Sequence, residues 1–198
     1  LHMSLEKTAF IFIGYQNDYF AQDGVLRAVI EDADRNRHIL KNTLNLLESL
    51  KEQPVTLIQT PIVFTDDYSE LNNPVGILKA VKEANAFRLG TPGGDILDSF
   101  KAYGERILTV HGKRGLNAFS NTTLEKTLES KGIKHVVLAG AVTSICIDST
   151  GRAAHDRGYS VTILSDCTAS RTPMEQEFYC ENIFPLYAEV VDSKNLLS

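Results

Sequence analysis

The sequence predicts an α/β fold of three layers, in which helices cover both faces of a mostly parallel sheet. Short apolar runs typical of buried strands alternate along the chain with segments of helical spacing. The helical segments supply the crossover connections that parallel strands need. Six strands in the order 3-2-1-4-5-6 would form a sheet whose direction of winding reverses between the first and fourth strands.

The first half of the chain begins with two strands and a helix between them. Residues 8–13 form a continuous apolar run, which is typical of a strand buried on both faces. Apolar residues recur at close to helical spacing over residues 34–50. Residues 55–64 predict the second strand, although Pro61 should end or bend it because proline cannot donate to the ladder.

A long irregular stretch over residues 66–94 separates the two halves and predicts a loop with one short helix over residues 76–84. Loops of this length inside a compact domain are usually functional, as lids or walls of binding sites. The second half is more regular, with strands expected over residues 106–110, 135–140, 159–165 and 186–191 and helices over residues 121–130, 143–157 and 173–182.

No internal repeat, low-complexity segment or linker interrupts this pattern, so we expect one domain over residues 4–198. Residues 1–3 are interpreted as an expression scar that precedes a start at Met3.

Composition narrows the class of partner. The 198 residues are 43% hydrophobic, which is enough to build a full core and excludes extended disorder. Lys and Arg number 20 against 25 Asp and Glu, and this acidic balance argues against nucleic acid or an anionic membrane as partner. No apolar run approaches the roughly 20 residues of a membrane-spanning helix. The three cysteines are widely spaced and favour a reducing, cytoplasmic compartment.

In sheets of this type, ligand sites lie beyond the carboxyl ends of the strands where the winding reverses. The segments after residues 13 and 140 are therefore the first to inspect. Thr143 or Ser144 is the expected N-cap of the helix that follows, which places Cys146 in its first turn. Free backbone N–H groups and the helix dipole favour a thiolate at that position, and the thiolate is the nucleophilic form of cysteine.

The same backbone N–H groups, together with that of Val142, would be able to hold the oxyanion of a tetrahedral intermediate. A buried structural role is the alternative for Cys146, since free cysteines are often core residues. Lys113 follows the third predicted strand, and a cation near the thiol would further favour the thiolate. Arg114 is the rival cation, and a solvated surface charge is the ordinary alternative for Lys113.

Several motifs spread over nearly the whole chain share one resemblance. They are Phe-Ile-Gly-Tyr-Gln-Asn-Asp-Tyr-Phe at residues 12–20, Lys113 with Asn-Ala-Phe at residues 117–119, Gly-Ala-Val-Thr-Ser-Ile-Cys at residues 140–146, Gly158-Tyr159, and Asp166. On these motifs the chain resembles the isochorismatase-like cysteine hydrolases, a superfamily that includes nicotinamidases and carbamoylases. The Gly-x-x-Thr-x-x-Cys element is the most specific part, and the resemblance implies the six-stranded order expected above.

The resemblance also implies roles for single residues. The family works with an Asp–Lys–Cys triad, so Cys146 would be the nucleophile and Lys113 the triad lysine. It implies a cis peptide bond between Ala141 and Val142, next to an oxyanion hole formed by the N–H groups of Val142 and Cys146. At the position of the triad aspartate this chain has Gly14. Glycine cannot transfer a proton, so the general acid–base of the family is missing.

Three explanations for Gly14 remain open. In the first explanation, another carboxylate acts as the general acid–base, with Asp18 as the first candidate and Glu175 or Glu177 as the others. Asp18 has an alternative role, because the resemblance implies that it mainly supports the loop after the first strand. In the second explanation, the reaction needs no general base, because Lys113 and the helix terminus already hold a thiolate. The last explanation is that catalysis has been lost through substitution at position 14.

We expect no metal and no cofactor. Nicotinamidases that resemble this chain bind a metal through an Asp-x-His element and a further His after the second strand. The corresponding residues 64–70 contain Asp66, Asp67 and Glu70 but no histidine. Exposed acidic loops are usually only solvated, and borderline metals prefer imidazole ligands. Nicotinamide deamidation is therefore less favoured.

The expected substrate is a small molecule, and four residues are candidates for its pocket: Tyr15, Gln16, Thr143 and Phe119. A homodimer or homotetramer is expected from the resemblance and from apolar residues of the long loop that need cover, namely Ile77, Leu78, Val81, Phe87 and Leu89.

The leading hypothesis is a cofactor-independent hydrolase that cleaves a C–N bond of an amide or carbamoyl compound through a thioester on Cys146. A catalytically silent member that binds a small molecule or a partner protein is the alternative from another class. Isochorismate-type vinyl-ether hydrolysis ranks lower, because in this family it uses the aspartate that the chain lacks.

Overall fold

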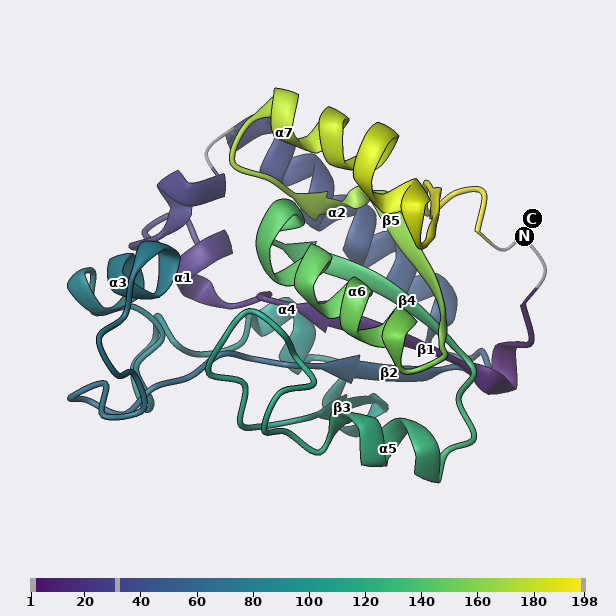
Figure 1. Cartoon of the computed structure of the whole chain (residues 1–198), viewed down its shortest axis with the longest axis horizontal. Helices are drawn as coiled ribbons and strands as arrows, with labels where there is room; N and C mark the ends of the chain where they lie inside the picture. The colour runs from purple at the N-terminus through teal and green to yellow at the C-terminus, as the bar shows by residue number, and fades with distance from the viewer. Residues whose placement is uncertain (1–2, 31–32, 197–198) are drawn as a thin grey trace.

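A sheet of six parallel strands forms the centre of the computed structural model, which describes residues 3–30 and 33–196 (Figure 1). The strand order is β3-β2-β1-β4-β5-β6, which confirms the predicted topology. Each pair of neighbouring strands is parallel. The strands are β1 (Thr8–Ile13), β2 (Thr56–Gln59), β3 (Ile107–Thr109), β4 (His135–Ala141), β5 (Ser160–Ala169) and β6 (Glu189–Val191).

Helices cover both faces of the sheet, as the predicted three layers require. The α-helices are α1 (Asn17–Phe20), α2 (Ala33–Leu50), α3 (Gly76–Glu83), α4 (Asp98–Lys101), α5 (Leu124–Ser130), α6 (Asp148–Asp156) and α7 (Pro173–Phe178). Shorter or differently wound turns are η1 (Leu5–Lys7), η2 (Arg27–Ile30), η3 (Gly104–Arg106), η4 (Thr143–Ile147), η5 (Tyr179–Ile183) and η6 (Phe184–Leu186).

Strand β1 explains why both faces need helices, because all six of its residues are buried. Phe10 and Phe12 belong to a hydrophobic cluster that includes residues of α2 and α4. Ile11 and Ile13 point to the opposite face and belong to a cluster with residues of α5 and α6. Of the segment 1–3, residues 1 and 2 lie outside the described residues, whereas Met3 packs against the first cluster.

Strand β2 is shorter than the sequence predicts and ends at Gln59 instead of residue 64. Pro61 follows almost at once and has no N–H to donate to the ladder. Beyond Pro61, an isolated bridge joins Ile62 to Lys113, which lies in the segment after β3. That bridge fixes the position of Lys113 at the carboxyl end of the sheet.

The predicted N-cap of the helix after β4 is wrong. Val142 is the N-cap residue, and the first turn is the wider η4, which continues into α6. Thr143 Oγ1 donates a hydrogen bond to Gln176 Oε1 at 2.6 Å, and the hydroxyl of Ser144 donates to the carboxylate of Glu175. Both hydroxyls therefore tie η4 to α7 and do not cap their own helix.

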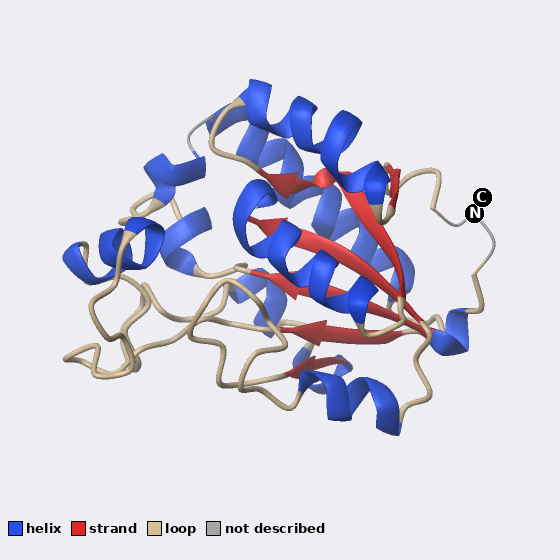
Figure 2. Ribbon diagram, viewed as in Figure 1, coloured by secondary structure: helices blue, strands red, loops and turns tan. Residues whose placement is uncertain are grey.

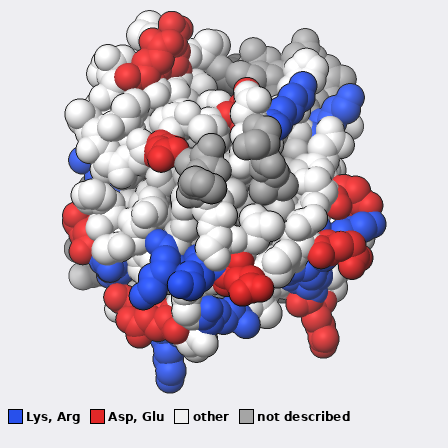
Figure 3. Space-filling view, turned by 90° about the vertical axis from the view of Figure 1, so that its right-hand side faces the viewer, with Lys and Arg blue, Asp and Glu red and all other residues white. Residues whose placement is uncertain are grey.

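The strand arrows in Figure 2 point toward the same end of the molecule, where α1, α3 and the long loop gather. The opposite end, seen in Figure 3, shows basic and acidic side chains interspersed. Within residues 3–30 and 33–196, no helix has the length and apolar character needed to span a bilayer.

Candidate active site

The thiol of Cys146 and the ammonium of Lys113 meet at the carboxyl end of the sheet. Nζ of Lys113 lies 3.4 Å from Sγ of Cys146 and donates a second hydrogen bond to the Gly115 carbonyl at 2.6 Å. Both side chains are buried, with exposed fractions of 7% for Cys146 and 1% for Lys113. The structure therefore places Lys113 next to the thiol. The rival cation Arg114 has its Nε 3.7 Å from a carboxylate oxygen of Glu70.

The burial of Lys113 has an electrostatic consequence. A buried ammonium is costly unless it is hydrogen-bonded and balanced by an opposite charge. Throughout the described part of the chain, no carboxylate lies within ion-pair distance of Lys113. Its two partners are a neutral carbonyl and the sulfur of Cys146. The sulfur of Cys146 is thus the one partner of Lys113 that is able to carry a negative charge.

A small cavity of about 10 Å³ adjoins the two side chains, which is room for about one water molecule. Most of its lining is apolar, and the titratable side chains in the lining are Tyr19, Lys113 and Cys146. The lining residues are Ile13, Gly14, Tyr19, Ile62, Ile77, Leu78, Val81, Phe87, Lys113, Leu116, Ala141 and Cys146.

Gly14 lies in this lining, so the position that the resemblance assigns to the triad aspartate does face the cavity. Its φ of +80° falls in the left-handed region that favours glycine. A Cβ atom on residue 14 would lie 3.1 Å from the Ala141 carbonyl oxygen and 3.3 Å from Cδ2 of Tyr19. A carboxylate at this position would therefore require both the backbone and the Tyr19 ring to shift.

Asp18, the first candidate for the missing acid, is used elsewhere. Its Oδ2 accepts a hydrogen bond from the backbone N–H of Phe87 at 2.7 Å, and its own N–H donates to the Gly93 carbonyl at 2.9 Å. Asp18 is not among the residues that line the cavity. The prediction that Asp18 donates the proton is thus not supported by its position, which fits the structural alternative.

The two glutamates also miss the cavity lining. The carboxylate of Glu175 accepts hydrogen bonds from Arg171, the shortest at 2.7 Å, and another from Ser144. The hydrogen bond from Arg171 holds the pKa of Glu175 below its ordinary value, which makes this group a poor proton donor at neutral pH. Glu177 is exposed on α7.

The backbone around the predicted oxyanion hole has an unusual form. The Ala141–Val142 peptide bond is cis, as the resemblance implies. The carbonyl of Val142 accepts hydrogen bonds from the N–H groups of Ile145 at 3.0 Å and Ile147 at 3.2 Å. No side chain caps the start of η4 within the described residues. Oxyanion binding by the N–H groups of Val142 and Cys146 remains a prediction.

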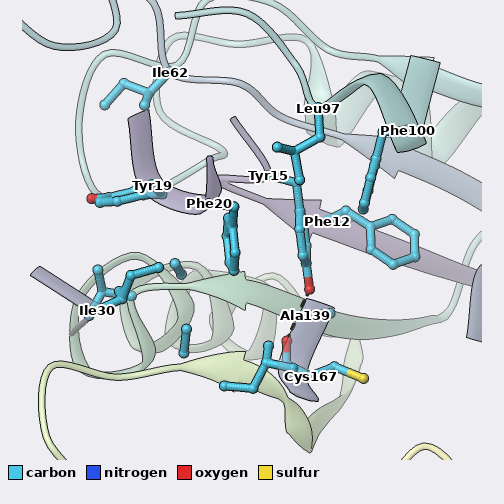
Figure 4. Close-up of a cluster of buried hydrophobic side chains, with 14 of the residues drawn as sticks. Phe12, Tyr15, Tyr19, Phe20, Ile30, Ile62, Leu97, Phe100, Ala139 and Cys167 are labelled. Atoms are coloured by element: carbon cyan, nitrogen blue, oxygen red, sulfur yellow. Dashed lines mark hydrogen bonds between the residues drawn. The ribbon is translucent and has the colours of Figure 1, made fainter. Parts of the chain in front are cut away.

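The four predicted pocket residues do not line this cavity, and their contact with a substrate stays a prediction. Tyr15 belongs to the core instead, where its ring stacks on Phe20 and Phe100. Its hydroxyl donates to the carbonyl of Cys167 at 3.1 Å, as the dashed line in Figure 4 shows. Thr143 is bound to α7 through Gln176, as described above.

Gln16 and Phe119 are likewise structural. The side-chain amide of Gln16 donates to the carbonyls of Ile62 at 2.8 Å and Gly94 at 2.9 Å, and so joins the segments after β1 and β2. Phe119 is buried in the second cluster, with the guanidinium of Arg157 4.7 Å from its ring centroid. Polar or aromatic character next to a strand end therefore marks loop support as well as ligand contact.

The carboxylates of the acidic loop are bound to neighbouring groups of the chain. Asp66 pairs with Arg88 at 3.2 Å, and Oδ1 of Asp67 accepts a hydrogen bond from the hydroxyl of Thr65 at 3.0 Å. Glu70 accepts a hydrogen bond from the backbone N–H of Thr65 at 2.9 Å. Among the described residues, no three His, Cys, Asp or Glu side chains are grouped so that they could hold a metal ion. These residues do not fit the metal site of the nicotinamidases.

The long loop forms the cavity wall, as its length predicted. Ile77, Leu78, Val81 and Phe87 all line the cavity, whereas Leu89 is 67% exposed. Their cover comes mostly from their own chain, which removes part of the argument for an oligomer.

Tyr19 is the titratable cavity residue that sequence reasoning missed. It is only 4% exposed and contacts the Phe87 ring edge-on, with 5.0 Å between the ring centroids. The available signal was its place in the segment after β1, five residues beyond Gly14. The direction of its ring depends on the turn of α1, which sequence spacing alone does not determine.

A wider groove of about 690 Å³ lies beside the same loops but does not include the thiol. Arg88, Leu89, His111 and Arg114 contribute to its lining, and neither Cys146 nor Lys113 does. We therefore locate the candidate chemistry in the smaller cavity, where the nucleophile and the buried cation are in contact.

Similarity to known proteins extends over nearly the whole chain. A family model described as the isochorismatase domain matches residues 8–195. The ureidoacrylate amidohydrolase RutB of Cronobacter sakazakii is 24% identical over 94% of this chain and 85% of its own length.

Two solved structures have the same fold. An isochorismatase family protein from Desulfovibrio vulgaris superposes with a TM-score of 0.81 at 19% identity, covering 96% of each chain. The N-carbamoylsarcosine amidase from Thermoplasma acidophilum superposes with a TM-score of 0.76 at 17% identity, covering 97% of this chain and 99% of that one.

Proposed function

This chain belongs to the isochorismatase family, and we propose that it is a cysteine hydrolase that cleaves a C–N bond of a small amide or carbamoyl compound. The observation that carries the proposal is the contact between the Cys146 thiol and the buried, otherwise unbalanced ammonium of Lys113. The names of two similar proteins, an amidohydrolase and an amidase, support the bond type.

In the proposed reaction, the thiolate of Cys146 attacks the carbonyl carbon of the substrate. The N–H groups of Val142 and Cys146 would stabilise the oxyanion that forms, because free N–H groups at a helix start favour negative charge. The C–N bond breaks, the amine leaves with a proton, and water hydrolyses the thioester. Lys113 keeps the sulfur ionised before the attack and after the thioester is cleaved.

The cavity also favours a class of substrate. Its lining is apolar except for the three titratable side chains, so an uncharged acyl or carbamoyl group fits it better than a charged one. The free space is small, and substrate entry would require the wall formed by α3 to move outward.

The competing function is a silent member that binds without turnover. The observation in its favour is that no carboxylate lines the cavity, which leaves the general acid–base of the family unfilled. Loss of general acid–base help typically costs roughly 10²–10⁴-fold in rate. Activated esters, whose leaving groups need no proton, should then react much faster than ordinary amides.

The two functions are separated by a test for the acyl-enzyme. The protein is mixed with p-nitrophenyl acetate, and intact mass with peptide mapping locates the acetyl group. We expect acetylation of Cys146, no such adduct in Cys146→Ala, and acetylation at least about tenfold slower in Lys113→Met because the cation no longer favours the thiolate.

Arg114→Met is the matched control, since this neighbouring cation faces Glu70 and should leave the rate unchanged. A wild-type protein that is folded but never acetylated on Cys146 would refute the hydrolase and favour the silent binder.

A further inference from the structure

The hydroxyl of Tyr19 is unusual among the buried tyrosines. Buried tyrosine hydroxyls usually find a hydrogen-bond partner. Tyr15 has the carbonyl of Cys167 at 3.1 Å, and Tyr68 has the carbonyl of Ala86 at 2.6 Å. Within the part of the chain that the structure describes, the Tyr19 hydroxyl has none, although the side chain is only 4% exposed. The Tyr19 oxygen is not among the fully enclosed side-chain atoms without a partner, so it keeps access to solvent or to the cavity and is open to a hydrogen-bond partner from outside the chain.

The location of Tyr19 gives its free hydroxyl a use. The Tyr19 side chain lines the cavity together with Cys146 and Lys113. Its ring occupies the space next to Gly14, where a Cβ atom would come within 3.3 Å of Cδ2. Figure 4 shows the hydroxyl pointing away from Phe20 and from the apolar cluster.

The side chains that line the cavity limit which group is able to give the leaving amine its proton. The cavity lining holds three titratable side chains. The sulfur of Cys146 is the nucleophile, and the ammonium of Lys113 is held by the Gly115 carbonyl and by that sulfur. The phenol of Tyr19 is the remaining group, and it has a free donor.

We propose that the Tyr19 hydroxyl is the proton donor to the leaving group, in place of the carboxylate that the chain lacks at Gly14. This inference rests on the proposed function, because it requires the thioester on Cys146.

Protons and bonds balance over the two halves of the reaction. When the C–N bond of the tetrahedral intermediate breaks, the nitrogen takes the phenolic proton and leaves as a neutral amine, and Tyr19 becomes a phenolate. In the second half, the phenolate takes a proton from water while the oxygen of that water bonds to the thioester carbon. The C–S bond then breaks and returns the Cys146 thiolate. The sum is amide plus water giving acid plus amine, with Tyr19 unchanged.

The electrostatics fit this order of events. Burial and the negative charge of Cys146 raise the pKa of Tyr19, so the phenol is protonated when substrate arrives. Once the sulfur is acylated it carries no charge, and that part of the increase disappears as the proton leaves.

The test compares leaving groups on one acyl group. Wild type and Tyr19→Phe are acetylated with p-nitrophenyl acetate, which needs no proton donor, and with trifluoroethyl acetate, which expels a more basic alkoxide. Rates are followed by intact mass. We expect Tyr19→Phe to change the p-nitrophenyl rate by less than about twofold and to slow the trifluoroethyl rate by about 10²-fold or more.

Tyr68→Phe is the matched control, because it removes a buried hydroxyl that lies outside the cavity lining. It should leave the ratio of the two rates unchanged. A ratio in Tyr19→Phe equal to that of wild type would overturn the role of Tyr19 while leaving Cys146 acetylation intact. Failure of the wild type to acetylate Cys146 would instead overturn the proposed function, and the inference with it.

Discussion

At the scale of single residues, the three cysteines differ in environment more than in sequence context. Burial and the charge of Asp166 raise the pKa of Cys167 to about 12, and burial with Glu181 raises that of Cys180 to about 11. Cys146 alone contacts a cation. We therefore expect iodoacetamide at pH 7 to label Cys146 first, because alkylation requires the thiolate.

Peptide mapping at short reaction times measures this order. In Lys113→Met, the labelling of Cys146 should slow, while the other two cysteines keep their rates. Labelling of Cys180 ahead of Cys146 in the wild type would contradict the assigned nucleophile.

Gly14 leads to a second prediction at this scale. An L-residue in the left-handed region costs roughly 1–2 kcal/mol, and the neighbouring carbonyl and ring leave little space for a side chain. We expect Gly14→Ala to lower the free energy of unfolding by about that amount in urea titrations. Gly115→Ala is the control, because a Cβ there meets nothing within 4 Å and the φ angle is not positive. Equal effects of the two substitutions would argue against strain at residue 14.

At the scale of elements, α1 supports the loop that carries part of the cavity wall. Besides the two contacts of Asp18, the side-chain amide of Asn17 donates to the Pro92 carbonyl at 2.6 Å. We expect Asp18→Ala to lower the free energy of unfolding by about 1–3 kcal/mol, because the buried N–H of Phe87 loses its acceptor. Asp18→Asn keeps an acceptor oxygen and should retain most of the stability and the Cys146 acetylation rate.

Denaturant titration and the acetylation assay together check the role of Asp18. The control is Asp98→Ala, since that carboxylate is fully exposed. If Asp18→Asn abolished turnover of poor leaving groups without loss of stability, Asp18 would be the acid after all.

The elements also show what sequence can predict. Strand positions followed from apolar runs such as residues 8–13, because burial on both faces leaves no polar position, whereas the strand order rested on the resemblance. The Cys146–Lys113 contact followed from the strand ends and from the resemblance. The N-cap was not predictable, because the hydroxyls of Thr143 and Ser144 bind α7, which lies some thirty residues later in the chain. The place of Tyr19 in the cavity was not predictable either, because it depends on the packing of α1 against the cavity wall.

At the scale of the whole molecule, the predicted homodimer or homotetramer remains a prediction. The cavity wall is covered by its own chain, but large apolar side chains stay exposed elsewhere, among them Val75, Leu89, Met174 and Leu186. Sedimentation velocity at micromolar concentration measures the assembly directly. We expect a species larger than the 21.9 kDa monomer, and a monomer alone would contradict the expectation.

The ring of Tyr19 beside Gly14 has a consequence for how this site can change over generations. An aspartate introduced at position 14 alone would force a side chain against the ring and into a strained backbone. Shortening Tyr19 alone would remove the free hydroxyl and widen the cavity. Each single step is costly, and a smaller side chain at position 19 would relieve the contact with the ring but not the backbone strain at residue 14. A lineage with this glycine and tyrosine is therefore held to its own solution of the proton-transfer problem.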